Sequence, residues 1–120
     1  MRHLLVVAHG SRREASNEEV RQLAADLIPR AAGRFDGVSC AFLEIAAPSI
    51  PEGIEAAVQA GAGEVVVMPY FLSAGRHVAE DIPREVAGKQ AEHPQVRMHI
   101  THYLGLAPGV PDILLELAGG

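Results

Sequence analysis

The sequence predicts an α/β fold in which a four-stranded parallel sheet lies between two layers of helices. Four short apolar segments of strand length alternate with four segments that have helical spacing or helix-start patterns. Such alternation is typical of parallel strands joined by right-handed crossovers, which place helices on both faces of the sheet. Because the chain has 120 residues, of which 48% are hydrophobic, we expect residues 1–120 to form a single domain with its own core.

The first predicted strand covers residues 3–8, a continuous apolar run that contains two valines. Continuous apolar runs are typical of strands that are buried on both faces. A helix follows, because Ser16 and Glu19 have the spacing of a capping box and the apolar residues after them fall on one helical face. We expect Pro29 and Gly33 to close this helix.

The second predicted strand covers residues 38–43. Ser49 and Glu52 repeat the capping-box spacing and predict the start of a second helix, which ends near Gly61. Residues 64–68 contain three consecutive valines, and β-branched residues favour strands. The third strand is therefore predicted here.

The third helix is predicted over residues 78–90, after a loop that follows the third strand. Pro83 suits the first turn of its regular part, and Asp81 is a possible N-cap. Residues 96–101 alternate between apolar and polar side chains, which predicts a fourth strand with one more exposed face. A short helix over residues 112–117 is expected to close the fold.

The composition excludes several classes of function. A formal net charge of -5 disfavours general binding to nucleic acid or to anionic membranes, since both need a basic surface. The first apolar run is too short to span a bilayer, and no cleavage site follows it. Cys40 is the only cysteine and has apolar neighbours, so we expect a buried thiol and a cytoplasmic protein.

Three side chains with metal-binding chemistry follow the first three predicted strands. These are His9, Glu44 and His77. In an open parallel sheet, ligands bind at the carboxyl ends of the strands, so these side chains are expected to meet. Two imidazoles and a carboxylate, without a second thiolate, suit divalent iron, cobalt, nickel or zinc. His102 follows the fourth strand, and whether it contributes stays open.

Small, hydroxyl-bearing and basic residues accompany these two histidines. Glycines allow a flat ligand to approach the backbone, and arginines give an acidic protein a local basic rim that pairs with ligand carboxylates. The expected ligand is therefore anionic and able to receive a metal. The candidate substrate-binding residues are Gly10, Ser11, Arg12, Ser73, Gly75 and Arg76, with Arg13 in the same basic rim.

Three groups of segments in this order are similar to the small class II chelatases, the CbiX-type sirohydrochlorin chelatases. The segments are residues 6–12 (VVAHGSR), 42–44 (FLE) with 48–51 (PSIP), and 69–72 (PYFL) with 75–78 (GRHV) and 81–83 (DIP). The resemblance covers nearly the whole chain, although residues 103–120 match less distinctively. It implies a chelatase-like, flavodoxin-like doubly wound fold.

The resemblance also implies an activity, which is insertion of cobalt or iron, and in some relatives nickel, into sirohydrochlorin without ATP. The product belongs to cobalamin or siroheme biosynthesis, and no organic cofactor is expected. In this interpretation His9 and His77 deliver the metal and accept protons, while Glu44 completes or charge-balances the site. Family members of this length are similar to one half of longer members, which predicts a homodimer, although pairing with a related chain stays open.

Two other functions remain open at the level of sequence. A non-enzymatic carrier of metal or tetrapyrrole needs the same ligands as a chelatase. A histidine-dependent phosphatase also places His-Gly after its first strand, but an arginine precedes that histidine, whereas this chain has Ala8. The sequence does not decide which metal is used. His3, His93 and His99 are interpreted as solvated surface residues.

Overall fold

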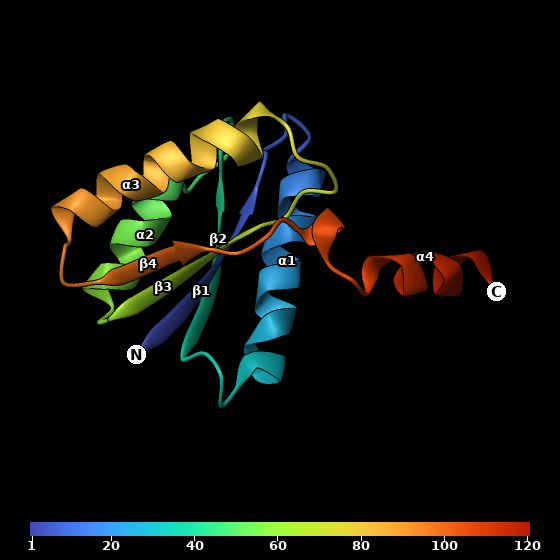
Figure 1. The fold of residues 1–120 in the computed structure, drawn as a ribbon, viewed down its shortest axis with the longest axis horizontal. Coiled ribbons are helices and arrows are strands. Elements are labelled where there is room, and N and C mark those ends of the chain that lie inside the picture. The colour runs from blue at the N-terminus through green and yellow to red at the C-terminus, as the bar shows by residue number, and fades with distance from the viewer.

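The computed structural model describes residues 1–120 and contains one four-stranded parallel sheet (Figure 1). The strand order is β2-β1-β3-β4, so β1 pairs with both β2 and β3. The predicted parallel sheet is therefore confirmed, and all four carboxyl ends lie at one edge. The strands are β1 (Arg2–Ala8), β2 (Gly37–Phe42), β3 (Glu64–Pro69) and β4 (Arg97–Ile100).

Helices cover both faces of the sheet, as predicted. In Figure 1, α1 lies on one side of the strands, and α2 and α3 lie on the other. None of the helices combines the length and the apolar composition needed to cross a membrane. The helices are α1 (Glu14–Ala31), α2 (Ile50–Gln59), a π-helical turn (His77–Asp81), α3 (Ile82–Glu92), a 3₁₀ turn (Leu104–Leu106) and α4 (Val110–Ala118).

The core has two halves because successive side chains of a strand point to opposite faces of the sheet. Leu5 and Val7 of β1 pack with buried residues of α2 and α3. Val6 and Ala8 pack on the other face with α1. Cys40 is buried in this second half, as predicted, and burial raises the pKa of its thiol.

The start and end of α1 differ from the prediction. The helix begins at Glu14, so Ser16 and Glu19 lie inside it and form no capping box. Pro29 also lies inside the helix, and the chain turns at Gly33, which has a left-handed φ of 89°. The earlier start accompanies a local contact, because the side-chain amide of the buried Asn17 holds the loop before α1 through hydrogen bonds to the backbone of Ser11.

The capping box at α2 is confirmed, and the predicted third helix is present but divides into a π-helical turn (His77–Asp81) and α3 (Ile82–Glu92). The Ser49 hydroxyl accepts from the Glu52 N–H, and the Glu52 carboxylate accepts from the Ser49 N–H. Asp81 stands at the N-cap position of α3, as predicted, but its side chain makes no capping hydrogen bond because its oxygens bond His77 and Arg84. Pro83 does lie in the first turn of α3. The predicted strand ends agree with the structure to within one residue.

Helix α4 extends away from the rest of the molecule (Figure 1). It is longer than the predicted 112–117, and none of its residues is buried. The sequence predicted a helix here but gave no indication that it leaves the body of the protein.

Candidate metal centre

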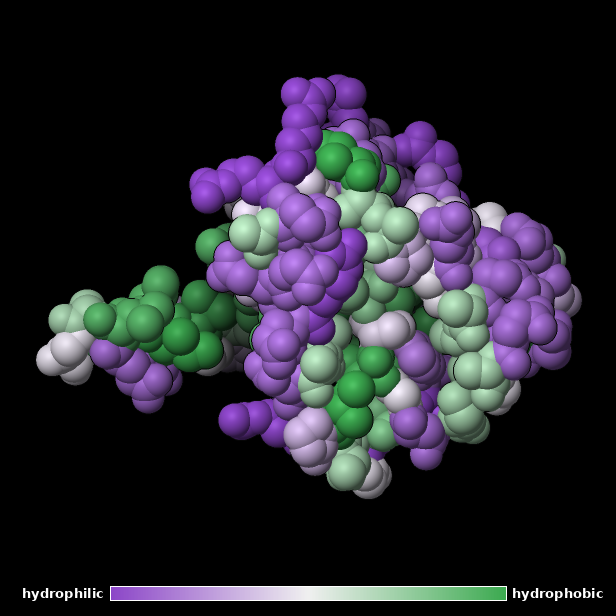
Figure 2. Space-filling model, turned by 180° about the vertical axis from the view of Figure 1, so that it is seen from behind, coloured by the Kyte–Doolittle hydropathy of each residue, from purple (hydrophilic) through white to green (hydrophobic).

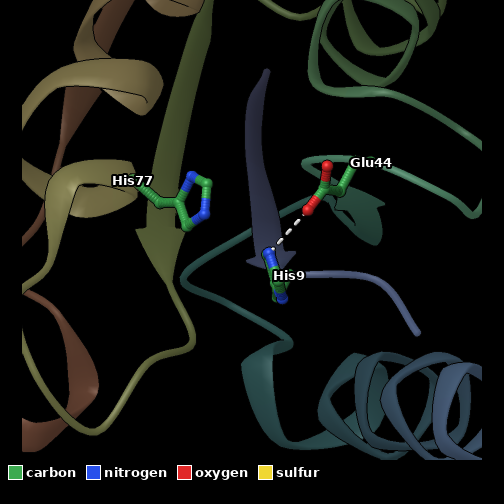
Figure 3. Close-up of side chains that lie close together, drawn as sticks. All are labelled: His9, Glu44 and His77. Atoms are coloured by element: carbon green, nitrogen blue, oxygen red, sulfur yellow. Dashed lines mark ion pairs between the residues drawn. The ribbon is translucent and has the colours of Figure 1, made fainter.

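His9, Glu44 and His77 meet at the carboxyl edge of the sheet, as the sequence predicted. His9 follows β1, Glu44 follows β2, and His77 opens the π-helical turn after β3. One ligand atom from each of the three lies within 4.8 Å of the others. Figure 3 shows Glu44 and His77 on either side of His9. We call these three residues the edge group.

The backbone fixes Glu44 beside His9. The Glu44 N–H donates to the His9 carbonyl at 3.1 Å, and the His9 Nε2 lies 2.8 Å from Glu44 Oε1. Gly10 has a φ of 96°, and a Cβ on it would lie 1.9 Å from the Glu44 carbonyl oxygen. Glycine is thus required here because the second loop passes against the first. This is a different reason from the ligand clearance inferred from the sequence.

Asp81 orients the His77 ring. The His77 Nδ1 lies 2.6 Å from Asp81 Oδ2, and the Arg84 guanidinium donates to the other carboxylate oxygen. Arg84, and to a lesser extent His77, lower the pKa of Asp81. An ionised carboxylate only accepts hydrogen bonds, so Nδ1 carries the proton and Nε2 keeps its lone pair for a metal.

The sequence interpretation missed this role of Asp81 and Arg84. The available signal was the spacing of four residues between His77 and Asp81, which places two side chains on one helical face. Asp81 was instead interpreted as an N-cap, because an acidic residue two positions before a proline is common at a helix start.

The edge group is open to ligands and has no protein cation of its own. The side chains of His9, Glu44 and His77 are 50%, 53% and 42% exposed. Glu44 pairs with no Lys or Arg side chain. A carboxylate and two imidazoles without a resident positive charge favour an external cation.

One hollow adjoins the edge group beside His77 and a second adjoins it beside His9, while a third, of about 350 Å³, lies between Glu44 and His77 and is also lined by Leu43, Asp81, Arg84 and Glu85. The first, of about 690 Å³, is lined by Arg76, His77, Glu80, Asp81 and Arg84. The second, of about 390 Å³, is lined by Ala8, His9, Gly10, Ser11, Ser16, Asn17, Val20, Phe42 and Tyr70. Both volumes lie in the range of small-molecule sites. A flat ligand over the edge group would extend into both.

The other candidate residues lie in several places. Ser11 lines the second hollow, and its hydroxyl accepts from the Arg13 N–H at 3.0 Å. Arg76 lines the first hollow, and its Nε lies 3.5 Å from Glu80 Oε2. The remaining candidates, which are exposed and line neither hollow, are Arg12, Ser73 and Gly75. His102 is not part of the edge group.

Three other histidines were interpreted as solvated surface residues, which is confirmed for His99, with a side chain 46% exposed, and wrong for His3 and for His93, with a side chain only 17% exposed. His3 is buried, with Nε2 2.7 Å from the Ser39 hydroxyl, and burial lowers its pKa. The His99 ring pairs with Glu64. His93 forms a second group of possible ligands with Glu55 and Glu92, which we call the α2–α3 group.

The model of the CbiX family matches residues 3–119 of the chain. A sirohydrochlorin ferrochelatase from Priestia megaterium is 31% identical over 115 residues, which cover 94% of this chain and 42% of that protein. A sirohydrochlorin cobaltochelatase from Methanocaldococcus jannaschii is 37% identical over 84 residues, 70% of this chain and 57% of that protein. The chain thus spans about half the length of these two relatives.

Two solved structures resemble the whole fold. A cobalamin (vitamin B12) biosynthesis CbiX protein from Marinobacter aquaeolei has a TM-score of 0.82 and 26% identity, covering 99% of this chain and 95% of that chain. The sirohydrochlorin chelatase SirB from Bacillus subtilis subspecies spizizenii, in complex with cobalt, has a TM-score of 0.86 and 26% identity. The match covers 98% of this chain and 50% of SirB.

Proposed function

The chain belongs to the CbiX family, and from this premise we propose that it inserts divalent cobalt or iron into sirohydrochlorin without ATP. The observation that carries the proposal is the edge group, in which three ligand atoms lie within 4.8 Å of one another between two hollows. The relatives named above include both ferrochelatases and cobaltochelatases. The product therefore feeds siroheme or cobalamin biosynthesis.

Metal capture is the first proposed step. The metal binds the Nε2 atoms of His9 and His77 and a carboxylate oxygen of Glu44. The proton between His9 Nε2 and Glu44 Oε1, which lie 2.8 Å apart, passes to solvent, and His9 binds the metal as a neutral imidazole with its one proton on Nδ1. Three ligands without a thiolate leave coordination positions open for the nitrogens of the macrocycle. They also hold the ion more weakly than a closed four-ligand structural site, so the ion can be passed on.

Transfer to the macrocycle is the second proposed step. The metal ion enters the ring as two pyrrole N–H bonds break, and two protons leave, so the charge balances without any redox change. As the metal leaves His9 and His77, their freed Nε2 lone pairs accept these protons, and solvent removes them. Glu44 balances the positive charge that remains on the imidazoles. The exposure of all three side chains permits this exchange.

Substrate binding is assigned to the residues around the edge group. Arg76 and Arg12 pair with the carboxylates of the anionic tetrapyrrole. Ser11 and Ser73 supply hydroxyl donors, and Gly10 and Gly75 present backbone to the flat ring. Of these six, Gly10 and Ser11 line the hollow beside His9, and Arg76 lines the hollow beside His77, which supports their assignment.

A second copy of the chain is proposed to face the site. The edge group is about half exposed, so the chain alone leaves the metal open on one side. The chain matches half of SirB, so two copies match the size of that longer relative. We also propose a cytoplasmic location, in keeping with the single buried thiol of Cys40.

The test is an insertion assay with purified protein, sirohydrochlorin and one metal at a time. Co²⁺, Fe²⁺ under anaerobic conditions, and Ni²⁺ are compared by following the absorption spectrum against a protein-free control. We expect catalytic acceleration for cobalt or iron, with many turnovers per protein. Stoichiometric binding of metal or tetrapyrrole without acceleration would identify a carrier and contradict the proposal.

A further inference from the structure

A set of polar side chains on α1 connects the loops that carry two members of the edge group. Helix α1 follows the loop that carries His9, and it packs on β2, which leads into the loop that carries Glu44. Three side chains from its first two turns, Glu14, Asn17 and Arg21, bond to one another and to these two loops. We call these three residues the α1 network. None of them takes part in the proposed capture or transfer of the metal.

Asn17 holds the loop that carries His9. Its side-chain oxygen accepts from the Ser11 N–H at 2.9 Å, and its nitrogen donates to the Ser11 carbonyl at 2.8 Å. Asn17 is only 2% exposed, so water does not compete for these bonds. The same nitrogen lies 3.4 Å from Glu14 Oε2, which connects this loop to the first turn of α1. The backbone two residues after His9 is therefore fixed to the helix.

Arg21 links the α1 network to the loop that carries Glu44. Its Nη1 donates to Glu14 Oε1 at 2.5 Å, and its Nη2 donates to the Ala47 carbonyl at 3.1 Å. Its guanidinium carbon also lies 5.3 Å from the centroid of the Phe42 ring, which is within the range of a cation–π contact. One side chain therefore joins the helix, the end of β2 and the loop after it.

The loop after β2 depends on such contacts because its backbone is strained. Ile45, directly after Glu44, has a left-handed φ of 71°. A β-branched residue rarely adopts this conformation, which persists only where surrounding contacts impose it. The Glu44 N–H bonds the His9 carbonyl before Ile45, and Arg21 bonds the Ala47 carbonyl after it. Arg21 thus holds the end of the strained segment that the His9 loop does not hold.

We propose that Arg21 is a positioning residue of the metal centre, which fastens the Glu44 loop to the same helical turns that hold the His9 loop. The inference rests on the proposed function, in which the edge group binds the metal. Metal ligands have to be held within roughly 0.5 Å of the productive geometry. Arg21 lines none of the three hollows beside the edge group, so it acts only through the loops. Without Arg21, the Glu44 loop relaxes, and the carboxylate leaves its place beside His9.

Arg2 provides a matched control, because it makes the same kinds of contact at the opposite edge of the sheet. Its Nε donates to Glu64 Oε1 at 2.9 Å, and its Nη1 donates to the Arg34 carbonyl at 3.1 Å. Its guanidinium carbon lies 4.5 Å from the centroid of the Phe35 ring. Both arginines thus bind a carboxylate, a backbone carbonyl and an aromatic ring, but only Arg21 does so beside the loops of the edge group.

The first experiment compares Co²⁺ binding to Arg21→Met and Arg2→Met by isothermal titration, with urea unfolding of the same samples. We expect both variants to lose stability, but only Arg21→Met to bind Co²⁺ roughly 10-fold or more weakly than the wild type. Arg21→Lys keeps the charge without the planar fork, so it should lose a smaller part of the affinity, and it provides the measurement if Arg21→Met does not fold. Unchanged affinity in the Arg21 variants, or an equal loss in Arg2→Met, would overturn the proposal.

The second experiment asks whether Arg21 acts through Glu44. In a Glu44→Gln background, Arg21→Met should weaken Co²⁺ binding no further, because the carboxylate that Arg21 positions is already absent. The visible spectrum of Co²⁺ bound to Arg21→Met should resemble that of Co²⁺ bound to Glu44→Gln. Losses of affinity that add in the double variant would mean that Arg21 affects the fold in general, which would overturn its positioning role.

The failures can be told apart. If the wild type binds Co²⁺ and His9→Ala does not, while Arg21→Met binds as the wild type does, only the role of Arg21 is defeated. If the wild type binds no Co²⁺, or His9→Ala binds it normally, the proposed function and the role of Arg21 are both defeated.

Discussion

The chain contains two groups of side chains that are similar in composition but differ in what they can bind. The edge group has two histidines and one glutamate, and the α2–α3 group has one histidine and two glutamates. In each group the ligand atoms lie within 4.8 Å of one another. Residue types and ligand distances alone therefore do not distinguish the two groups as candidate metal sites.

The two groups differ in whether a lysine pairs with their carboxylates. In the α2–α3 group, the Lys89 Nζ lies 2.7 Å from Glu55 and 3.0 Å from Glu92, and His93 also bonds Glu55 at 2.8 Å. The protein thus supplies the cation itself. In the edge group, no Lys or Arg pairs with Glu44, and the ligands lie beside two hollows. The comparison teaches that the proposed metal site differs from the α2–α3 group in lacking a paired protein cation and in lying at the open carboxyl edge.

The largest expected effect comes from removing an imidazole of the edge group. We expect His9→Ala and His77→Ala each to lower Co²⁺ affinity and insertion rate by roughly 100-fold or more, since each removes a direct ligand. Isothermal titration and the insertion assay measure these effects. His93→Ala is the matched control and should bind Co²⁺ normally. Equal losses in all three variants would mean that the two groups do not differ.

A smaller loss is expected when the orientation of His77 is disturbed. Asp81→Ala should weaken Co²⁺ binding by about 10–100-fold, because the Asp81 carboxylate accepts from His77 Nδ1 and so orients the ring that binds the metal. Asp81→Asn keeps an oxygen acceptor for the Nδ1 proton and should recover part of the affinity. Glu80→Gln, at the neighbouring position, is the control. If Asp81→Ala bound Co²⁺ as tightly as the wild type, the contact of 2.6 Å between His77 Nδ1 and Asp81 Oδ2 would not contribute to metal binding.

Removing the lysine should make the two groups more alike. In a His9→Ala background, Lys89→Met removes the internal cation and leaves Glu55, Glu92 and His93 without it. We expect weak Co²⁺ binding to appear, which is detectable by the visible spectrum of the bound metal. The His9→Ala variant with Lys89 intact is the control. Continued absence of binding would show that ligand geometry, and not the cation, separates the groups.

The smallest expected effect is a decrease in the free energy of unfolding at low pH. Lys89, then His93 and Gln59, lower the pKa of Glu55 from its ordinary 4.5 to about 2. Because this pKa is lower in the folded state, Glu55 contributes stability above pH 4.5, and the contribution is lost as the pH falls toward 2. Urea unfolding between pH 6 and pH 2 measures the change. In Lys89→Met, the free energy of unfolding should fall less between pH 4.5 and pH 2 than in the wild type. An equal fall in both proteins would contradict the role of Lys89 in lowering the pKa of Glu55.

The sequence predicted the features that depend on local pattern. Apolar runs of strand length gave the four strands, and the Ser49 and Glu52 spacing gave the start of α2. The edge group followed from one topological rule, because the carboxyl ends of parallel strands meet at one edge of the sheet. His9, Glu44 and His77 were found in this way although they are far apart in the chain.

The features that the sequence did not predict depend on contacts between distant segments. Lys89 and Glu55 come from different helices, so no local pattern indicates that they pair. The start of α1 is a more local case, because the Asn17 amide bonds the backbone of Ser11 and the helix begins at Glu14, which the capping-box spacing of Ser16 and Glu19 did not indicate. Helix α4 extends away from the rest of the molecule, with hydrophobic residues gathered along it (Figure 2), and its residues alone predict only a helix.

The account is tested most directly by locating the metal. Crystals of the protein soaked with Co²⁺ are measured at wavelengths on either side of the cobalt absorption edge. We predict one strong anomalous peak among His9, Glu44 and His77, and no peak at Glu55, Glu92 and His93. A peak at the α2–α3 group, or an edge group that stays empty at saturating Co²⁺, would contradict the account.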